Sequence, residues 1–129
     1  AYETYGKLSE KKDNAILAFH ALSGDQFATG TNPITNKSGW WSYLVGPNKA
    51  IDTNKFFVIC ANVIGGCMGS YGPNSTDPKT NKTVGTNFPV ITINDMINVQ
   101  YNLLEFFKQT FSSRYCDILE ELSKTISIL

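Results

Sequence analysis

The chain has 129 residues, of which 42% are hydrophobic and 17% charged, and 11 Lys and Arg balance 11 Asp and Glu. This length allows one domain at most, no apolar run approaches the roughly 20 residues of a membrane span, and no basic cluster suits phosphate contacts. We therefore expect neither a membrane nor a nucleic-acid partner. Three unevenly spaced cysteines and one histidine disfavour a disulfide framework and a metal site, and reduced thiols are typical of cytosolic proteins.

Three segments have the composition of strands. Residues 14–20 and 55–62 are mostly apolar runs, which is typical of strands buried on both faces. Residues 1–5 predict the end of another strand, followed by a turn at Gly6. Between the two apolar runs, residues 39–46 contain adjacent tryptophans and predict a brief amphipathic helix.

Residues 92–107 are the strongest helix candidate. Thr92 or Asn94 can cap this segment, and Asp95 lies in its first turn, where the helix dipole favours an anion. Apolar side chains recur along it at three- and four-residue spacings. The order strand, short helix, strand, long loop and helix predicts an α/β fold with a mostly parallel sheet.

Two further segments are a long glycine-rich connection and a C-terminal tail. Residues 63–89 hold four Gly and one Pro among their first eleven positions. A connection of this length in a compact domain predicts a functional surface. Residues 108–129 predict a separate, helical tail, because their apolar residues fit one helix face. We therefore divide the chain into residues 1–107 and residues 108–129.

The sharpest local feature is the end of the first apolar run, at residues 20–25 (HALSGD). A strand that stops at His20 and opens into small residues leaves backbone N–H groups pointing outward. Such groups can bind a developing oxyanion. The alternative is a plain turn with a buried, hydrogen-bonded His20, and the residues alone leave both interpretations open.

A second candidate is the glycine-rich segment at residues 65–72 (GGCMGSYG). A nucleophile elbow around Ser70 needs glycine where Met68 stands, and a phosphate loop needs a lysine that the segment lacks. A Cys67–His20 pair lacks a third, orienting group. The remaining interpretation is a loop whose backbone approaches a neighbour closely. Three aromatic residues predict either a ligand pocket or core packing: Trp40, Trp41 and Tyr43.

Six segments in order carry a family resemblance: residues 1–9 (AYETYGKLS), 20–25 (HALSGD), 39–41 (GWW), 45–53 (VGPNKAIDT), 57–73 (FVICANVIGGCMGSYGP) and 88–95 (FPVITIND). Together they resemble homoserine O-acetyltransferase, an acyltransferase family of methionine biosynthesis. The resemblance extends to about residue 107. It implies the N-terminal part of an α/β-hydrolase fold with a mostly parallel sheet, left incomplete.

The resemblance also implies a mechanism. Family members use a Ser-His-Asp triad in a ping-pong cycle, in which the serine takes acetyl from acetyl-CoA and passes it to the homoserine hydroxyl. One oxyanion donor of this fold comes from the loop after the third strand, which corresponds to residues 20–24. The backbone N–H of Leu22 is assigned this role by resemblance, whereas His20 is not the triad histidine. No bound cofactor or metal is implied, since acetyl-CoA is a co-substrate, and the full-length enzyme is implied to be a cytoplasmic homodimer.

The resemblance stops where the tail begins. From Lys108 onward no G-x-S-x-G follows, so the triad Ser, Asp and His are absent from this chain. The first family strand has no counterpart before Ala1, which also stands where a Met is expected. We therefore expect a fragment of a homoserine O-acetyltransferase that is inactive alone. The alternatives are a non-catalytic remnant or CoA- or ligand-binding module, and a related serine or homoserine acyltransferase that uses another acyl donor.

Overall fold

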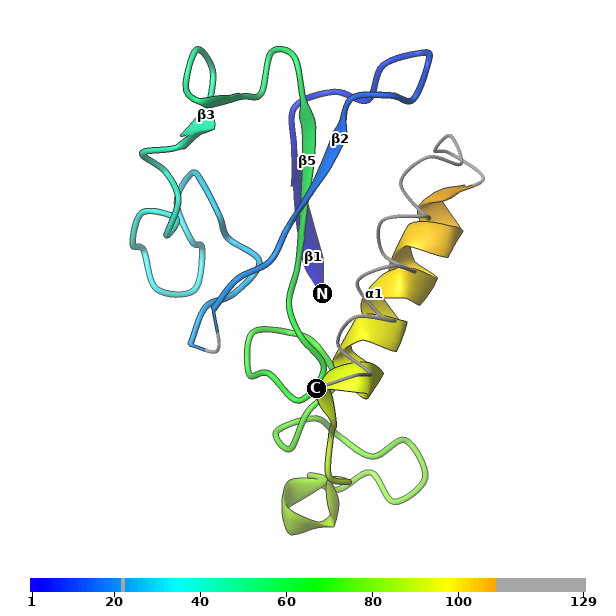
Figure 1. The fold of residues 1–129 in the computed structure, drawn as a ribbon. Coiled ribbons are helices and arrows are strands. Elements are labelled where there is room, and N and C mark those ends of the chain that lie inside the picture. Colours follow the sequence, from blue (N-terminus) through cyan, green and yellow to red (C-terminus); the bar gives the residue numbers. More distant parts are fainter. Residues whose placement is uncertain (22, 109–129) are drawn as a thin grey trace. The chain divides into compact units, whose positions relative to one another are not determined.

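The computed structural model describes residues 1–21 and 23–108, and the chain divides into two compact units, Ala1–Asn62 and Val63–Leu129. The described elements are β1 (Tyr2–Tyr5), β2 (Ala15–Ala18), β3 (Val45–Gly46), β4 (Ile51–Asp52), β5 (Phe57–Ala61), the 3-10 helix η1 (Gly85–Asn87) and α1 (Ile93–Lys108) (Figure 1). From residue 109 on, the predicted helical tail lies outside the described residues. The division after residue 107 therefore stays a prediction.

The first unit contains a three-stranded sheet in which β5 lies between β1 and β2 (Figure 1). β1 pairs antiparallel with β5, from Tyr2 opposite Ala61 to Tyr5 opposite Val58. β2 pairs parallel with β5, with Ala15 opposite Phe57. All three predicted strands are therefore confirmed, as is the parallel pairing of the two apolar runs.

The core of this unit is centred on β5. Val58 and Cys60 are fully buried and Ile59 is 1% exposed, so the strand is covered on both faces, as its continuous apolar run predicts. Burial of a Val or Ile side chain contributes roughly 1.5–3 kcal/mol. Half-buried residues pack against the buried cluster from four segments: Tyr5, Ile16, Trp40, Trp41 and Ile51. The strand that pairs with both neighbours is thus also the main source of apolar burial.

The helix predicted over residues 39–46 is wrong. Trp40 to Leu44 form turns, and the chain then extends into β3, which pairs parallel with β4. The backbone N–H groups of Gly39 and Trp41 donate to the carbonyls of Gly30 and Ala28, each at 2.8 Å. The N–H groups of Leu44 and Val45 both donate to the Trp41 carbonyl, and β3 then pairs with β4, so a single turn forms before the chain extends. Tertiary hydrogen bonds override the local amphipathic pattern.

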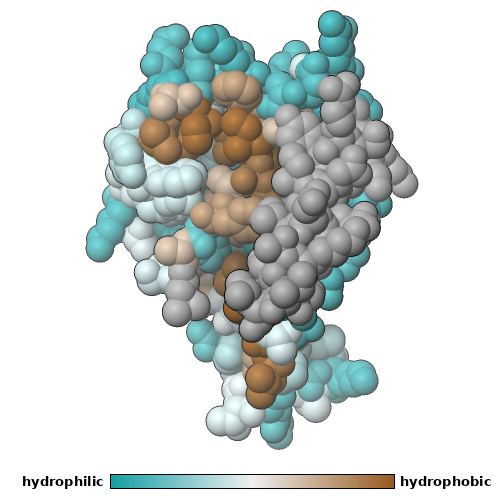
Figure 2. All heavy atoms as spheres, in the orientation of Figure 1, coloured by the Kyte–Doolittle hydropathy of each residue, from teal (hydrophilic) through white to brown (hydrophobic). Residues whose placement is uncertain are grey.

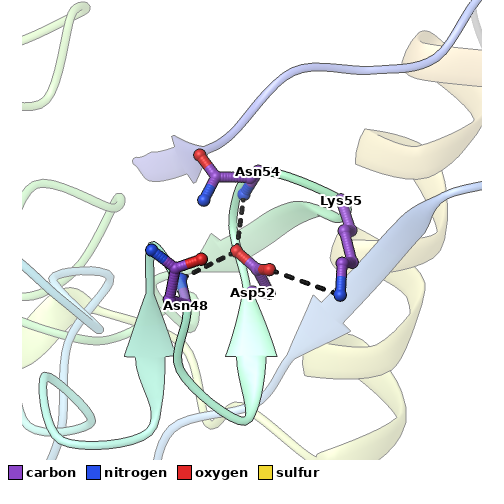
Figure 3. A network of polar contacts seen from close by, with 4 residues as sticks. All are labelled: Asn48, Asp52, Asn54 and Lys55. Carbon is purple, nitrogen blue, oxygen red and sulfur yellow. Dashed lines mark hydrogen bonds and ion pairs between the residues drawn. The ribbon is translucent and has the colours of Figure 1, made fainter.

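Asp52 organises the connection from β3 through β4 to β5. Its carboxylate accepts hydrogen bonds from the backbone N–H groups of Asn48 (2.9 Å) and Asn54 (3.0 Å), and its other oxygen lies 3.6 Å from the Lys55 ammonium (Figure 3). These backbone hydrogen bonds lower the pKa of Asp52. Asn48 has a φ of 58°, a left-handed conformation that Asn tolerates. The network is structural and holds two consecutive turns in place.

The predicted helix and its cap in the second unit are confirmed. The Thr92 hydroxyl accepts from the Asp95 backbone N–H (3.2 Å), and the Asp95 carboxylate accepts from both the backbone N–H (2.8 Å) and the hydroxyl (2.7 Å) of Thr92. This reciprocal arrangement satisfies donors that the first helical turn leaves unpaired. It also lowers the pKa of Asp95, chiefly through the side-chain hydrogen bond from Thr92.

Each unit contains one copy of an eight-residue loop, at residues 31–38 (TNPITNKS) and 76–83 (TDPKTNKT), here called the twin loops. In each loop the first and last residues form an antiparallel bridge. In each loop the backbone N–H of the second residue, Asn32 or Asp77, donates to the carbonyl of the seventh residue at 2.8 Å. The carbonyl of the second residue accepts from the N–H of the sixth residue at 2.8–2.9 Å. In both, the sixth residue, Asn36 or Asn81, has a φ near +55°. The loop geometry therefore depends on the local sequence rather than on its surroundings.

Large apolar side chains lie exposed in both units. Ile34 is 63% exposed in the first unit, and Val90 (93%) and Phe106 (74%) are exposed in the second. Hydrophobic residues are visible on the surface in Figure 2. In complete globular proteins, extensive apolar exposure often marks a surface that another element covers. Over the described part of the chain, no helix is both long and apolar enough to cross a membrane.

Candidate functional site

The candidate site is the turn that follows β2. The backbone N–H of Gly24 donates to the Ala21 carbonyl at 2.7 Å, which closes the turn, and the His20 Nδ1 lies 2.7 Å from the same oxygen. Leu22, the predicted oxyanion donor, lies outside the described residues, so its role stays a prediction. The structure places its neighbours Ala21 and Ser23 on the exposed surface, just past the carboxyl end of a buried parallel strand.

The turn requires glycine at position 24. A Cβ there would lie 2.8 Å from the Cβ of His20 and 3.1 Å from the Ala21 oxygen. Both distances are shorter than ordinary van der Waals contacts, and neither neighbouring atom is the flexible end of a side chain. The small residues in the HALSGD segment therefore serve a close approach of the chain to itself.

The segment that leaves the turn is held by side chains from three distant positions. Trp40 Nε1 donates to the Asp25 carbonyl at 2.9 Å, and the Tyr5 hydroxyl donates to the Gln26 carbonyl at 3.1 Å. The Cys60 thiol also approaches the Asp25 carbonyl, at 3.7 Å. These three side chains come from β1, β5 and the residues before β3, so the turn is tied to the sheet.

Burial adds to the preference of two of these anchoring groups for the protonated form, which both already have at neutral pH. It raises the pKa of the Tyr5 hydroxyl and raises that of the Cys60 thiol to about 12. Both groups are therefore neutral donors at physiological pH. The sequence alone did not indicate them, because Tyr5 and Gln26 are 21 residues apart and Cys60 and Asp25 are 35 residues apart.

The Asp25 carboxylate connects the turn to the first twin loop. One oxygen accepts from the Phe27 backbone N–H at 2.8 Å, and the other accepts from the Asn32 amide at 2.9 Å. Asn32 is 4% exposed, and its side-chain oxygen Oδ1 accepts hydrogen bonds from the backbone N–H groups of Ile34 and Thr35. The residues after the candidate oxyanion turn are thus fixed by both backbone and side-chain contacts.

The predicted aromatic group divides into packing and exposed residues. The rings of Trp40 and Trp41 have centroids 4.8 Å apart, and both pack against the core cluster. The core interpretation therefore holds for the two tryptophans, and Trp40 adds the hydrogen bond to Asp25. Tyr43 is 76% exposed and does not belong to the core.

The glycine-rich segment at residues 65–72 folds against itself. The Gly65 backbone N–H donates to the Tyr71 carbonyl at 2.8 Å, and a Cβ on Gly72 would lie 2.6 Å from the Gly66 oxygen. No helix follows Ser70, because residues 71–75 form bends and turns, so the geometry of a nucleophile elbow is absent from this described segment. The close backbone approach that the glycines predict is an internal one.

No single unit brings the other chemical candidates together among its described residues. Cys67 is exposed and belongs to the second unit, whereas His20 belongs to the first. Across residues 1–21 and 23–108, no group of three or more His, Cys, Asp or Glu side chains is arranged to hold a metal ion. The turn after β2 is therefore the described feature that best suits chemistry.

Comparisons with known proteins agree with the family resemblance of the sequence. No family model matches the chain. A homoserine O-acetyltransferase of Pelagibacter ubique is 75% identical over 107 residues, which cover 83% of this chain and 29% of that protein. A homoserine O-acetyltransferase of Methanococcus vannielii is 58% identical over 114 residues, which cover 87% of this chain and 23% of that protein.

Solved structures match the same portion of the fold. The crystal structure of esterase E22 matches with a TM-score of 0.72 and 39% identity, covering 82% of this chain and 31% of the esterase. The homoserine O-acetyltransferase from Bacillus anthracis matches with a TM-score of 0.71 and 38% identity, covering 82% and 30%. The chain thus spans less than a third of the relatives that it matches. We conclude that the chain matches part of the homoserine O-acetyltransferases at high identity and has an incomplete α/β-hydrolase fold.

Proposed function

We propose that this chain is part of an enzyme that transfers an acetyl group from acetyl-CoA to the hydroxyl of homoserine. The observation that carries the proposal is the 75% identity to the Pelagibacter ubique homoserine O-acetyltransferase over 107 residues. The turn at residues 20–24 supports it, because its small residues and exposed position after a parallel strand suit a backbone oxyanion donor. Leu22 would supply that donor through its backbone N–H.

The proposed reaction has two acyl-transfer steps. A serine outside this chain attacks the thioester carbonyl of acetyl-CoA, its proton passes to a histidine, and the C–S bond breaks as the CoA thiolate takes up that proton. The homoserine hydroxyl then loses its proton to the same histidine and attacks the acetyl-serine ester. The serine leaves with that proton. In both steps the carbonyl oxygen becomes negative, and the Leu22 N–H would stabilise this charge.

The chain alone is proposed to be inactive. Its one histidine, His20, directs Nδ1 to the Ala21 carbonyl, whereas a triad histidine directs this nitrogen to a carboxylate. The acid, base and nucleophile must therefore come from the part of the enzyme outside this chain. Loss of a whole triad leaves only the residual effect of oxyanion and binding contacts.

A chimera tests the proposal. Residues 1–107 would replace the matching segment of the Pelagibacter ubique enzyme, and release of the CoA thiol from acetyl-CoA would be measured with and without homoserine. We expect homoserine-dependent release by the chimera, and none by the 129-residue chain or by the Pelagibacter enzyme without this segment. A correctly folded but inactive chimera, or turnover by the isolated chain, would contradict the proposal.

The same assay separates two related activities. The likeness to esterase E22 makes ester hydrolysis the second candidate, because water then replaces homoserine as the acetyl acceptor. CoA release that needs no homoserine would favour hydrolysis, and faster turnover with serine or succinyl-CoA would favour a related acyltransferase. The cytoplasmic location and homodimer that the resemblance implies stay predictions for the full-length enzyme.

A further inference from the structure

The second unit contains a pocket of about 570 Å³ beside the second twin loop. This volume lies within the range of small-molecule sites, roughly 300–1,000 Å³. The apolar part of its lining comes from four residues: Tyr71, Pro78, Val84 and Pro89. The charged part comes from the loop itself, through Asp77, Lys79 and Lys82. An apolar lining with a few charged groups is the usual composition of a ligand site.

The negative charge of the pocket is engaged within the loop. Asp77 Oδ1 accepts a hydrogen bond from the Lys79 backbone N–H at 2.8 Å, and Oδ2 accepts one from the Thr80 hydroxyl at 3.0 Å. These hydrogen bonds, chiefly the one from Lys79, lower the pKa of Asp77. Its carboxylate is therefore ionised at neutral pH, and with two ammonium groups it leaves a net charge of +1 on the lining.

The positive charges of the pocket are available to a ligand. Lys79 and Lys82 are exposed, and no hydrogen bond or ion pair to a described residue engages either ammonium group. The backbone N–H groups of Asp77, Lys79 and Asn81 all donate within the loop. A bound anion would therefore contact the lysine side chains, each of which has three N–H donors. A phosphoryl group suits two such neighbours, because it carries a charge of about −1.5 to −2 at neutral pH.

Comparison of the twin loops shows that their geometry does not depend on Lys79. The fourth position holds Ile34 in the first loop and Lys79 in the second, and it is the one position where the residue type differs. Oδ1 of Asn32 accepts from the Ile34 backbone N–H at 2.8 Å, as Oδ1 of Asp77 does from that of Lys79. Isoleucine thus permits the same loop, and the lysine stands in the loop that lines the pocket.

From these observations we propose that the pocket binds a phosphoryl group, with Lys79 and Lys82 contacting its oxygens and the apolar lining contacting any organic part of the ligand. Two sources share this chemistry: inorganic phosphate, and the phosphates of CoA, which the proposed reaction releases. The site does not depend on the proposed function, because its evidence is the lining and charge of the pocket alone.

Calorimetric titration of the 129-residue chain at low ionic strength tests the site. The probes are inorganic phosphate, CoA and pantetheine, which is the phosphate-free thiol portion of CoA. We expect phosphate and CoA to bind, pantetheine not to bind, and higher ionic strength to weaken both interactions. Tighter binding of CoA than of phosphate would support the site and identify CoA as the source, whereas equal binding would support it with free phosphate as the source. Absence of binding by phosphate and CoA, or equal binding of pantetheine and CoA, would overturn the proposal.

The twin loops supply variants that keep the loop geometry. Lys79→Ile and Asp77→Asn each introduce the residue that the first loop holds at that position. We expect Lys79→Ile and Lys82→Ala each to raise the Kd for phosphate by about 3- to 10-fold, because one of two cationic contacts is lost. Asp77→Asn should lower the Kd by about 2- to 5-fold, because it removes the like charge from the lining. Lys37→Ala, at the position in the first loop that matches Lys82, is the control and should leave the Kd unchanged.

The outcomes separate this site from the proposed function. A Kd for phosphate that is unchanged in both Lys79→Ile and Lys82→Ala would overturn the assignment to this pocket. Equal weakening by Lys37→Ala would also overturn it, since it indicates general attraction to a positive surface. An inactive chimera would overturn the proposed function and leave this site standing, whereas an active chimera does not rescue a chain that binds no phosphoryl group.

Discussion

Gly6 and Gly30 offer a matched pair for testing the close approach of the chain before β5. Both have left-handed backbone angles, with φ of +82° and +76°. A Cβ on Gly6 would lie 2.2 Å from the Phe56 oxygen and 2.6 Å from the Thr53 oxygen, whereas a Cβ on Gly30 would meet nothing within 4 Å. Substitution by alanine therefore adds the same type of strain at both sites and a steric clash at Gly6 alone.

The magnitudes follow from these contacts. Left-handed strain costs a non-glycine residue about 1–2 kcal/mol, which is the whole effect expected for Gly30→Ala. Gly6→Ala must also displace the two backbone carbonyl oxygens that its Cβ would meet at 2.2 and 2.6 Å, and overpacking of this kind costs about 1–3 kcal/mol more. The first unit, with 62 residues, has a stability on the order of 3–9 kcal/mol, so Gly6→Ala removes a large share of it.

Urea unfolding followed by tryptophan fluorescence measures the difference. Both tryptophans, Trp40 and Trp41, lie in the first unit, so the signal reports this unit alone. With a slope near 1 kcal/mol/M, we expect a midpoint shift of about 1–2 M for Gly30→Ala and roughly twice that, or a lost transition, for Gly6→Ala. Equal shifts for the two variants would refute the reasoning from backbone contacts.

Three further predictions concern the cap, the thiols and the sheet edge. Hydrogen bonds from Thr92 lower the pKa of Asp95. The stabilisation of α1 by this cap is therefore fully present above the ordinary Asp pKa of about 3.9, and it is lost as the pH falls through the lowered pKa. Far-UV circular dichroism should show a loss of helix signal over this pH range. Asp95→Asn should remove the pH dependence, because the amide does not titrate. Iodoacetamide should label the exposed Cys67 in the native chain. It should label the buried Cys60, whose pKa is raised to about 12, only in denaturant. Equal labelling of the two thiols in the native chain, measured by peptide mass spectrometry, would contradict the burial of Cys60. β2 pairs with a described strand on one side only, so the chain should self-associate in light scattering and Leu17→Lys should reduce association. A parent chain that stays monomeric would contradict this.

The elements that the sequence predicts well are those fixed by local composition. The apolar runs around β2 and β5 are short and bounded by turn residues, which favours a buried strand over a helix. Thr92 with Asp95 forms a complete cap within four residues. The predicted helix at residues 39–46 failed because the chain extends at Val45 to pair with Ile51, which ends the turns of residues 40–44. A local pattern contains no information about that pairing.

The position of the candidate site was predictable from the sequence, but the hydrogen bonds that hold its turn in place were not. The HALSGD segment marked the turn, and its glycine is explained by the contact with His20. The anchoring hydrogen bonds from Tyr5, Trp40 and Cys60 depend on the strand order β1-β5-β2, which brings distant residues together. The twin loops were accessible from the sequence as a repeat, because seven of their eight positions hold the same or a closely similar residue.

The twin loops have a consequence for the chain entropy of folding. Each lies in a long connection, one between β2 and β3 and the other between β5 and α1, and each returns the chain alongside itself over eight residues. When a twin loop closes through its own hydrogen bonds, fewer flexible residues remain between the two elements that the connection joins. The entropic cost of loop closure rises by only about 0.6 kcal/mol per doubling of loop length. Each twin loop therefore lowers this cost by a fraction of that amount. Their larger effect is conformational: hydrogen bonds within eight residues hold part of each long, strand-poor connection in one path.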